Sequence, residues 1–352
     1  MTIKIGFIGT GLISHMHLAF LMTSSEPNRV VAVHDVDPDR ARAFASLCGA
    51  SVVGVDELFD AVDLVYVTTW TSEHPSLVRA AADRGVAVYC EKPLATTVTD
   101  VEQMIADVER AGVANQVGLV LRSLPAWLLV RDLVADPAAG RLMAVSFRDD
   151  QYIPVQGRYA STWRGDPARA GRGALIEHSI HDVDILQWAF GDVTEVTGRV
   201  REFHGLDRID DVATAQLAFG SGAVASLTSV WHDVLERPSM RFVEVFCERL
   251  AVSIDGDSDA TVRWQYTGHD ADERSGVALV QECRERGIAP TDDVTELLGG
   301  RVFNPATPFL HALRTGGPSP LPVREALAAH RIVDAVYRSA DHGARPVEIV
   351  AG

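Results

Sequence analysis

The fold is decided at the start of the chain, where the sequence IKIGFIGTGLIS spans residues 3–14. Residues 3–8 are an apolar run that glycines end, and residues 12–22 follow with a helical pattern. This order predicts a strand, a tight turn and a helix. Glycines in such a turn let a ligand approach the backbone, and the N–H groups that open the helix can hold a pyrophosphate. We therefore expect a dinucleotide-binding turn made of Gly9, Thr10, Gly11, Leu12 and Ile13.

Two further residues bear on which nucleotide this turn would hold. Ser14 stands where the dinucleotide fingerprint has its third glycine, so the match is partial. Asp35 ends a second apolar strand, residues 30–34, where its carboxylate can accept bonds from a ribose 2′-hydroxyl and repel a 2′-phosphate. The sequence therefore predicts NAD as the cofactor, while Arg40 and His34 leave NADP possible.

Strands alternate with helices throughout residues 1–122. Further strands are expected at 64–69, 86–90 and 115–121, and helices at 38–48, 75–84 and 99–111. Because each crossover helix must cover a face of the sheet, this alternation predicts a parallel, doubly wound Rossmann domain. Ligands of such sheets bind beyond the carboxyl ends of the strands. The residues expected there are Thr69, Trp70, His74, Glu91 and Lys92.

The pattern changes after residue 122. Helices are expected at 126–135, 174–190 and 323–339, and strands at 142–148, 193–203, 213–219, 223–230, 241–247 and 250–254. The stretch 255–300 is acidic and weakly patterned and receives no assignment. Residues 123–352 are therefore predicted to form a second α/β domain with a mostly antiparallel sheet.

Composition limits the partners of the protein. The 352 residues include 32 Lys and Arg against 48 Asp and Glu, and the net charge of −16 repels nucleic acid and anionic membrane surfaces. No apolar stretch is long enough to cross a bilayer, and residues 1–6 run straight into a strand instead of a signal peptide. The four cysteines lack paired spacing, which favours free thiols. These features predict a cytoplasmic protein.

Three residues suggest hydride chemistry. A hydride leaves an alcohol carbon only as the hydroxyl proton is removed, so the reaction needs a base and a cation beside the oxygen. His181 suits the first role and Lys92 the second. Glu177, four residues before His181, is expected on the same helix face, where it can orient the imidazole. Each residue taken alone is more typical of an ordinary surface position.

A metal site is a competing interpretation of the same helix. His178, His181, Asp182 and Asp184 carry imidazoles and carboxylates that can ligate zinc. No third partner stands at a fixed spacing from the two histidines, so no metal is predicted.

Several strings together resemble the Gfo/Idh/MocA family, the glucose-fructose oxidoreductase and inositol dehydrogenase group. They are Glu91-Lys92-Pro93, Trp163-Arg164 and the stretch from Gly173 to Asp184. The resemblance covers nearly the whole chain, and it implies that the sheet of the second domain, residues 123–352, is large and open and serves substrate binding and oligomerisation. It implies that Lys92 is catalytic together with Glu177 and His181, and that Arg122, Trp163 and Arg164 border the nicotinamide and the substrate. Two departures are Glu177, where the family usually has aspartate, and Trp70, where proline is common.

The resemblance implies reversible oxidation of a secondary alcohol on a sugar, inositol or related polyol, with NAD or NADP, in a homodimer or homotetramer. Polar candidates for binding substrate hydroxyls are Tyr152, Arg158, His178, His232 and Arg237. Two alternatives stay open. One is an NADPH-dependent reductase acting on a nucleotide-sugar ketone, and the other is a non-catalytic sensor that binds a dinucleotide.

Overall fold

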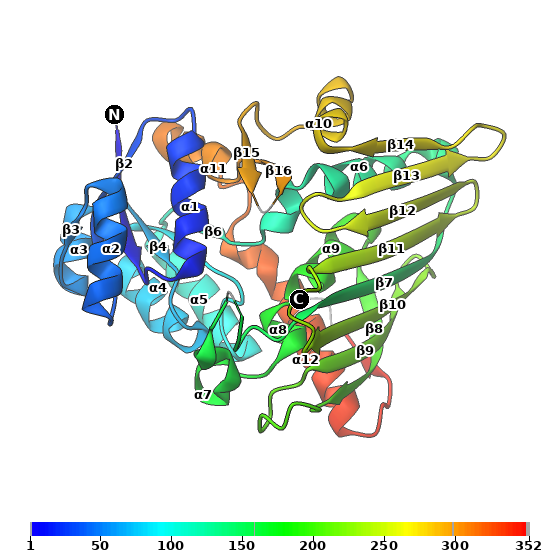
Figure 1. The fold of residues 1–352 in the computed structure, drawn as a ribbon, viewed down its shortest axis with the longest axis horizontal. Coiled ribbons are helices and arrows are strands. Elements are labelled where there is room, and N and C mark those ends of the chain that lie inside the picture. Colours follow the sequence, from blue (N-terminus) through cyan, green and yellow to red (C-terminus); the bar gives the residue numbers. More distant parts are fainter. Residues whose placement is uncertain (1, 158, 298, 350–352) are drawn as a thin grey trace. The chain divides into compact units, whose positions relative to one another are not determined.

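The computed structural model describes residues 2–157, 159–297 and 299–349. The chain divides into two compact units (Figure 1). The first contains the chain up to Leu119 together with Thr291–Thr295 and Asn304–Leu327, and the second contains the remainder. The sequence prediction placed residues 1–122 in the first domain and everything later in the second. The structure differs because the chain returns to the first unit twice after residue 290.

The first unit is built on a six-stranded sheet with the order β3-β2-β1-β4-β5-β6. All neighbouring strands run parallel, which confirms the predicted doubly wound Rossmann fold. The strands are β1 (Ile3–Ile8), β2 (Asn28–His34), β3 (Ser51–Val52), β4 (Leu64–Val67), β5 (Ala87–Cys90) and β6 (Asn115–Val117). Strands β4 and β5 are buried at every position, as expected where both faces of a sheet are covered.

The helices that follow these strands are α1 (Leu12–Thr23), α2 (Pro38–Cys48), α3 (Val55–Ala61), α4 (His74–Asp83) and α5 (Val98–Ala111), with a short 3₁₀ turn η1 (Thr71–Glu73) before α4. The side chain of Asp37 caps α2 by accepting the N–H groups of Asp39 and Arg40. Strand β3 and helix α3 were not predicted. The two residues of β3 are exposed and carry no apolar alternation that a sequence pattern would show.

A late segment completes the first unit. It contains α11 (Ala306–Thr315) and the 3₁₀ turn η5 (Val323–Ala326). The N–H of Val117 donates to the carbonyl of Leu321 (3.0 Å), and the side chain of Asn115 accepts the N–H of Val323 (2.9 Å). Val323 and Ala326 join the buried apolar cluster beside the sheet. These contacts lie along β6, at the edge of the sheet.

The second unit is built on a nine-stranded sheet with the order β14-β13-β12-β11-β7-β10-β9-β8-β17. Strands β7 and β10 run parallel and the other pairs described are antiparallel, which confirms the predicted sheet type. The strands are β7 (Leu142–Tyr152), β8 (Val193–Arg201), β9 (Val212–Phe219), β10 (Val224–His232), β11 (Met240–Cys247), β12 (Leu250–Gly256), β13 (Thr261–Tyr266), β14 (Asp272–Ser275) and β17 (Val347–Glu348).

The helices of this unit are α6 (Pro125–Ala135), α7 (Pro167–Ala170), α8 (Ala174–Glu177), α9 (Ile180–Phe190), α10 (Gly276–Glu285) and α12 (Leu327–Asp341), and the 3₁₀ turns are η2 (Val120–Ser123), η3 (Pro137–Ala139) and η4 (Thr162–Gly165). The stretch left unassigned from sequence forms β13, β14, α10 and β15 (Val294–Leu297), which pairs with β16 (Gly300–Phe303).

The two faces of the large sheet differ in burial. On β7, Val145 and Phe147 point to the buried face, where Phe147 stacks on Trp127 of α6 with ring centres 5.5 Å apart. Ser146 and Arg148 alternate with them and point to the other face, called here the outer face. The same alternation on β9, β10 and β11 makes the outer face half-buried or exposed along its centre.

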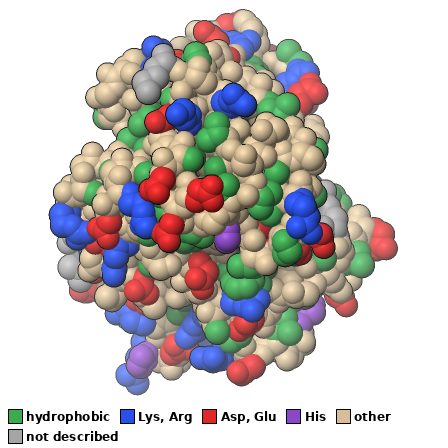
Figure 2. All heavy atoms as spheres, turned by 90° about the vertical axis from the view of Figure 1, so that its left-hand side faces the viewer, with side chains coloured by type: hydrophobic (Ala, Val, Ile, Leu, Met, Phe, Trp, Pro, Cys, Tyr) green, Lys and Arg blue, Asp and Glu red, His purple; other side chains and the backbone are tan. Residues whose placement is uncertain are grey.

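Within the described ranges, no helix combines the length and apolar character that crossing a membrane requires. Figure 2 shows acidic and basic side chains interspersed over one face of the molecule.

Candidate active site

The turn after β1 fits a dinucleotide. Gly9 has a φ of +90°, and a Cβ there would lie 2.5 Å from the carbonyl oxygen of Thr68, so the position requires glycine. Gly11 precedes α1, and a Cβ there would meet nothing within 4 Å among the described residues. No side chain caps this helix at Gly11. The backbone of the first turn of α1 is therefore available to an anionic ligand.

Ser14 replaces the third glycine without opening the turn. Its side chain is fully buried, and its hydroxyl donates to the carbonyl of Gly9 (2.8 Å) and to Oγ1 of Thr68 (3.2 Å). In the fingerprint, a glycine at this position allows the helix and the strand to pack closely. Here the hydroxyl of Ser14 instead joins helix α1 to the turn by hydrogen bonds.

Asp35 follows the last residue of β2, and its side chain forms hydrogen bonds with the glycine turn. Its Oδ2 accepts the N–H and the hydroxyl of Thr10 at 2.7 and 2.9 Å, and its Oδ1 accepts the N–H of Asp37 at 2.9 Å. A carboxylate oxygen can accept two hydrogen bonds, so Oδ1 keeps capacity for a ribose hydroxyl. The predicted role of Asp35 is compatible with this geometry, and the contact with Thr10 is an addition to it.

The loop after β4 contains Thr69, Trp70 and His74. The imidazole of His74 is buried, with Nδ1 2.9 Å from the carbonyl of Pro93 and Nε2 3.3 Å from the carbonyl of Thr69. His74 therefore joins the loop after β4 to the loop after β5. Trp70 is half-buried at the start of η1.

Lys92 is half-buried and lies two residues beyond the carboxyl end of β5. The preceding Glu91 is buried, with Oε1 2.6 Å from Nε2 of His17 in α1, and its Oε2 accepts the N–H of Lys92 at 3.0 Å. Burial raises the pKa of Glu91, but the hydrogen bond to His17 and the nearby positive charges outweigh it and lower the pKa overall. Sequence reasoning missed His17, whose only signal was a polar residue among the apolar positions of α1.

In the second unit, the predicted single helix over 174–190 is wrong in one respect. It is interrupted at His178 and Ser179, between α8 and α9. The N–H of His181 donates to the carbonyl of His178 (3.3 Å), three residues earlier, in the turn that opens α9. Glu177 and His181 therefore do not share one face of a regular helix, and each belongs to its own element.

Glu177 is buried, and its carboxylate accepts a hydrogen bond from Nε of Arg164 at 3.2 Å. The guanidinium of Arg164 also stacks over the ring of Trp163, 4.7 Å from its centre. The structure thus brings together three of the predicted site residues. His181 is buried in the first turn of α9, 8% exposed.

Arg122 serves α9. Its Nε and Nη2 donate to the two carboxylate oxygens of Asp184 at 2.9 and 2.7 Å, a bidentate pair that is largely buried. The guanidinium also lies 5.7 Å from the ring centre of Trp188. Sequence reasoning assigned Arg122 to the nicotinamide, and its role there stays a prediction.

His178 reaches a buried ionic network. Its Nε2 lies 2.7 Å from Oδ2 of Asp149 on β7. Arg241 of β11 donates to Asp182 at 2.7 Å and lies 3.7 Å from Asp149, and it also pairs with Asp257. Burial raises the pKa of Asp149 to about 6 and that of Asp182 to about 7. Among the described residues, no three or more His, Cys, Asp or Glu side chains are gathered as a metal site.

Because of this network, we expect the free energy of unfolding to decrease as the pH rises from about 4 to about 7. The carboxyl of Asp182 holds its proton up to about pH 7 in the folded state, against an ordinary pKa of 3.8. The folded state therefore binds more protons between these values, and the free energy of unfolding decreases across them. In Asp182→Asn we expect this decrease in the free energy of unfolding, measured by urea unfolding from pH 5 to 8, to be smaller by about 2–3 kcal/mol. An unchanged slope would contradict the assignment.

The remaining substrate candidates lie elsewhere. Adjacent residues of a strand point to opposite faces, so Asp149 points to the buried face and Asp150 to the outer face. Arg237 pairs with Asp150 (2.5 Å), and Nε2 of His232 lies 3.5 Å from it. Tyr152 shares this face by register. The structure thus separates Tyr152, His232 and Arg237 from His178, while Arg158 lies outside the described residues.

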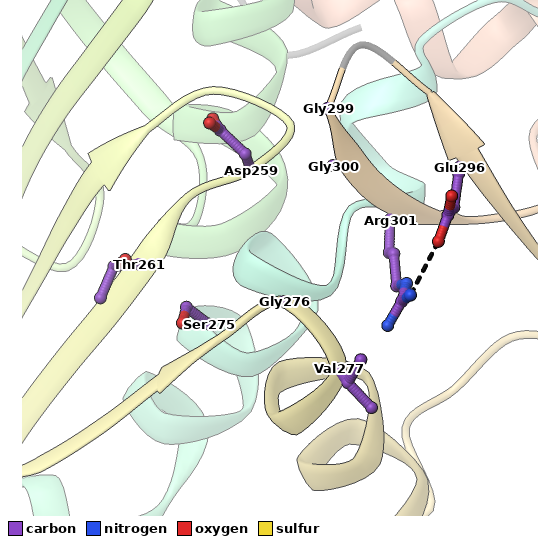
Figure 3. Close-up of a pocket in the computed structure, with 9 residues that line it drawn as sticks. All are labelled: Asp259, Thr261, Ser275, Gly276, Val277, Glu296, Gly299, Gly300 and Arg301. Carbon is purple, nitrogen blue, oxygen red and sulfur yellow. Dashed lines mark hydrogen bonds and ion pairs between the residues drawn. The ribbon is translucent and has the colours of Figure 1, made fainter.

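A cavity of about 590 Å³ opens near the β14 edge of the large sheet (Figure 3). Its lining residues are Asp259, Thr261, Ser275, Gly276, Val277, Glu296, Gly299, Gly300 and Arg301. Arg301 of β16 and Glu296 of β15 pair at 2.7 Å on the hairpin that forms one side of the cavity. None of the predicted site residues lines this cavity.

Comparisons with known proteins agree with the fold and the motifs. Residues 3–119 match the model of an oxidoreductase family with an NAD-binding Rossmann fold, and residues 127–253 match the GFO/IDH/MocA C-terminal domain. The chain is 30% identical over 363 residues to D-apiose dehydrogenase of Paraburkholderia graminis, covering 98% of this chain and 89% of that protein. It is 34% identical over 197 residues to inositol 2-dehydrogenase 3 of Saccharopolyspora erythraea, covering 54% and 55%.

Solved structures give the same fold. An oxidoreductase domain protein from Kribbella flavida superposes with a TM-score of 0.85 at 26% identity, covering 100% of both chains. Levoglucosan dehydrogenase, solved with NADH and levoglucosan, superposes with a TM-score of 0.85 at 20% identity over 99% of this chain and 100% of that one. The predicted family, NAD cofactor and oxidoreductase class are confirmed, and the chain belongs to the GFO/IDH/MocA oxidoreductase family.

Proposed function

We propose that the protein transfers a hydride between a secondary alcohol of a sugar, inositol or related polyol and NAD. The observation that carries this proposal is the glycine turn before α1 in the same unit as Lys92, at the carboxyl ends of β1 and β5. Membership of an NAD-binding oxidoreductase family supports the redox chemistry. Relatives named D-apiose dehydrogenase and inositol 2-dehydrogenase support a polyhydroxylated substrate.

The proposed mechanism gives three residues separate tasks. His181 removes the proton of the substrate hydroxyl, and Lys92 stabilises the negative charge that develops on the same oxygen. Glu177, whose carboxylate accepts a hydrogen bond from Arg164, would orient the imidazole of His181. Bound NAD would supply the hydride acceptor and would be held by the turn at Gly9–Gly11 and by Asp35.

The assembly and location belong to the same proposal. Burying apolar side chains of the outer face, such as Phe242 and Phe246 of β11, would favour a homodimer or homotetramer. The described structure has its four cysteines as free thiols, which suits the reducing cytoplasm. The first unit would hold the cofactor and the second would hold the substrate.

A panel of sugars, polyols and sugar acids tests the activity. The purified protein is incubated with each compound and either NAD or NADP, and formation of the reduced cofactor is followed by absorbance. We expect turnover with at least one polyol and NAD. Binding of NAD without turnover of any compound would favour a dinucleotide sensor.

Cofactor choice depends on Asp35. Asparagine keeps an oxygen for Thr10 but removes the charge that repels a 2′-phosphate, so Asp35→Asn is expected to shift the kcat/KM ratio of NADP to NAD upward by about tenfold. The measurement is steady-state kinetics with both cofactors. Asp37→Asn is the matched control, because Asp37 caps α2 two residues later. An unchanged ratio in Asp35→Asn would remove Asp35 from cofactor recognition.

A further inference from the structure

The chain has almost no lysine. Lys and Arg total 32, and only two of these residues are lysines, Lys4 and Lys92. Arginine supplies a permanent charge spread over a planar group, whereas lysine is a compact ammonium that suits close contact with a developing charge. The use of lysine at 92 therefore raises the question of what fixes its position.

The residue before Lys92 is held by an ion pair inside the first unit. His17 and Glu91 are 2% and 6% exposed, and their side-chain atoms approach to 2.6 Å. A buried carboxylate is costly unless it is paired, because its water shell is lost. The lowered pKa of Glu91 indicates that the pairing keeps it ionised. One carboxylate oxygen faces His17, and the other accepts the N–H of Lys92.

Aromatic rings leave this pair little freedom. The imidazole of His17 lies 4.8 Å from the ring centre of Tyr89 and 5.4 Å from that of Tyr66, and these two tyrosines stack on each other at 4.5 Å. Both tyrosine hydroxyls are buried, and neither has a hydrogen-bond partner in the described structure. The rings thus position the imidazole by packing, while the carboxylate receives its polar contacts from His17 and the backbone of Lys92.

We propose that His17 is a positioning residue for Lys92, acting through Glu91. The imidazole holds one oxygen of the carboxylate, and the other oxygen holds the backbone of Lys92 beyond β5. This inference rests on the proposed function for the catalytic consequence, since it assumes that Lys92 acts on the substrate. The placement of Lys92 itself does not depend on the substrate.

Gly118 offers an independent way to disturb the pair. A Cβ at this position would lie 2.6 Å from Oε1 of Glu91, the oxygen that faces His17. Gly118→Ala therefore pushes the carboxylate without altering either partner. If the pair positions Lys92, this variant and His17→Ala should produce the same defect.

The kinetic test compares His17→Ala, His17→Gln and Gly118→Ala with the wild type on a substrate from the panel. We expect His17→Ala and Gly118→Ala to lower kcat by about 10–100-fold, with KM for NAD changed less than about threefold. Glutamine can still donate to Glu91, so His17→Gln should recover most of the activity. Asp107→Asn is the matched control, because Asp107 is a buried carboxylate of the same unit, paired with Arg79 and Arg110.

A spectroscopic test needs no substrate. Reductive methylation with carbon-13 formaldehyde labels Lys4 and Lys92, besides any free amino terminus, so the lysine signals can be assigned by Lys4→Arg and Lys92→Arg. We expect the Lys92 signal to move in His17→Ala and Gly118→Ala but to stay in Asp107→Asn, with Lys4 constant throughout. An unmoved Lys92 signal together with wild-type kcat would overturn the proposal. If the wild type oxidises no polyol, the proposed function fails while this spectrum still decides the positioning.

Discussion

Lys92→Ala is expected to lower kcat for polyol oxidation by about 10²–10³-fold, with KM for NAD changed less than about fivefold. The physical reason is that the ammonium stabilises the oxygen only as negative charge develops on it, so its loss raises the barrier more than it weakens binding. Lys92→Arg should restore little activity, because the larger planar guanidinium cannot take the place of a compact ammonium. Steady-state and single-turnover kinetics measure both effects.

Lys4→Ala is the matched control for this experiment. Lys4 is the other lysine of the chain and is exposed on β1, where its side chain has no assigned role in the site. We expect it to retain wild-type kcat. Wild-type turnover in Lys92→Ala would eliminate Lys92 as the group that stabilises the developing charge.

The second large effect is expected from Gly173→Ala, just before α8. A Cβ at Gly173 would lie 1.9 Å from the carbonyl oxygen of Asp210 and 2.5 Å from its nitrogen. These are backbone atoms that also bind the helix: the carbonyl of Asp210 accepts the N–H of Ala174 at 2.6 Å, and its carboxylate accepts those of Gly173 and Leu175. Main chain cannot swing aside as a side chain can, so the start of α8 must separate from Asp210.

We expect Gly173→Ala to destabilise the second unit by about 3 kcal/mol or more, measured by urea unfolding followed by tryptophan fluorescence. Because α8 carries Glu177, activity should fall together with stability. Gly220→Ala in the same unit is the control, since its nearest contact would be 3.6 Å from a side-chain methyl. Equal stability of the two variants would refute the close packing of Gly173 against Asp210.

Much of the first unit could be predicted from sequence, because its strands and helices each have a pattern within a short stretch of the chain. A buried parallel strand is a short apolar run, and a helix after it has its own period, so residues 3–111 show their alternation directly. The same locality explains what was missed. Strand β3 has only two exposed residues, and residues 304–327 join the first unit through contacts about two hundred positions away from β6 in sequence, which no local pattern encodes.

The candidate site was predicted less completely, for two physical reasons. The break between α8 and α9 leaves apolar periodicity intact on both sides, so 174–190 has the pattern of one helix. The ionic partners of the site come from distant strands: Asp149 and Arg241 meet His178 and Asp182 only because β7 and β11 are neighbours in the sheet. His17 was overlooked because its partner Glu91 is 74 positions away.

The returning segment 304–327 affects how the protein is made. Strand β6 is synthesised about two hundred residues before Leu321 and Val323, whose backbone groups pair with it. Until residues 304–327 have been synthesised, strand β6 of the first unit lacks these partners. Its backbone groups and the apolar side chains beside it are then exposed to other nascent chains. The first unit is therefore complete only after residues 304–327 have been synthesised, and a gene truncated before residue 304 would yield an incomplete first unit instead of a smaller working module.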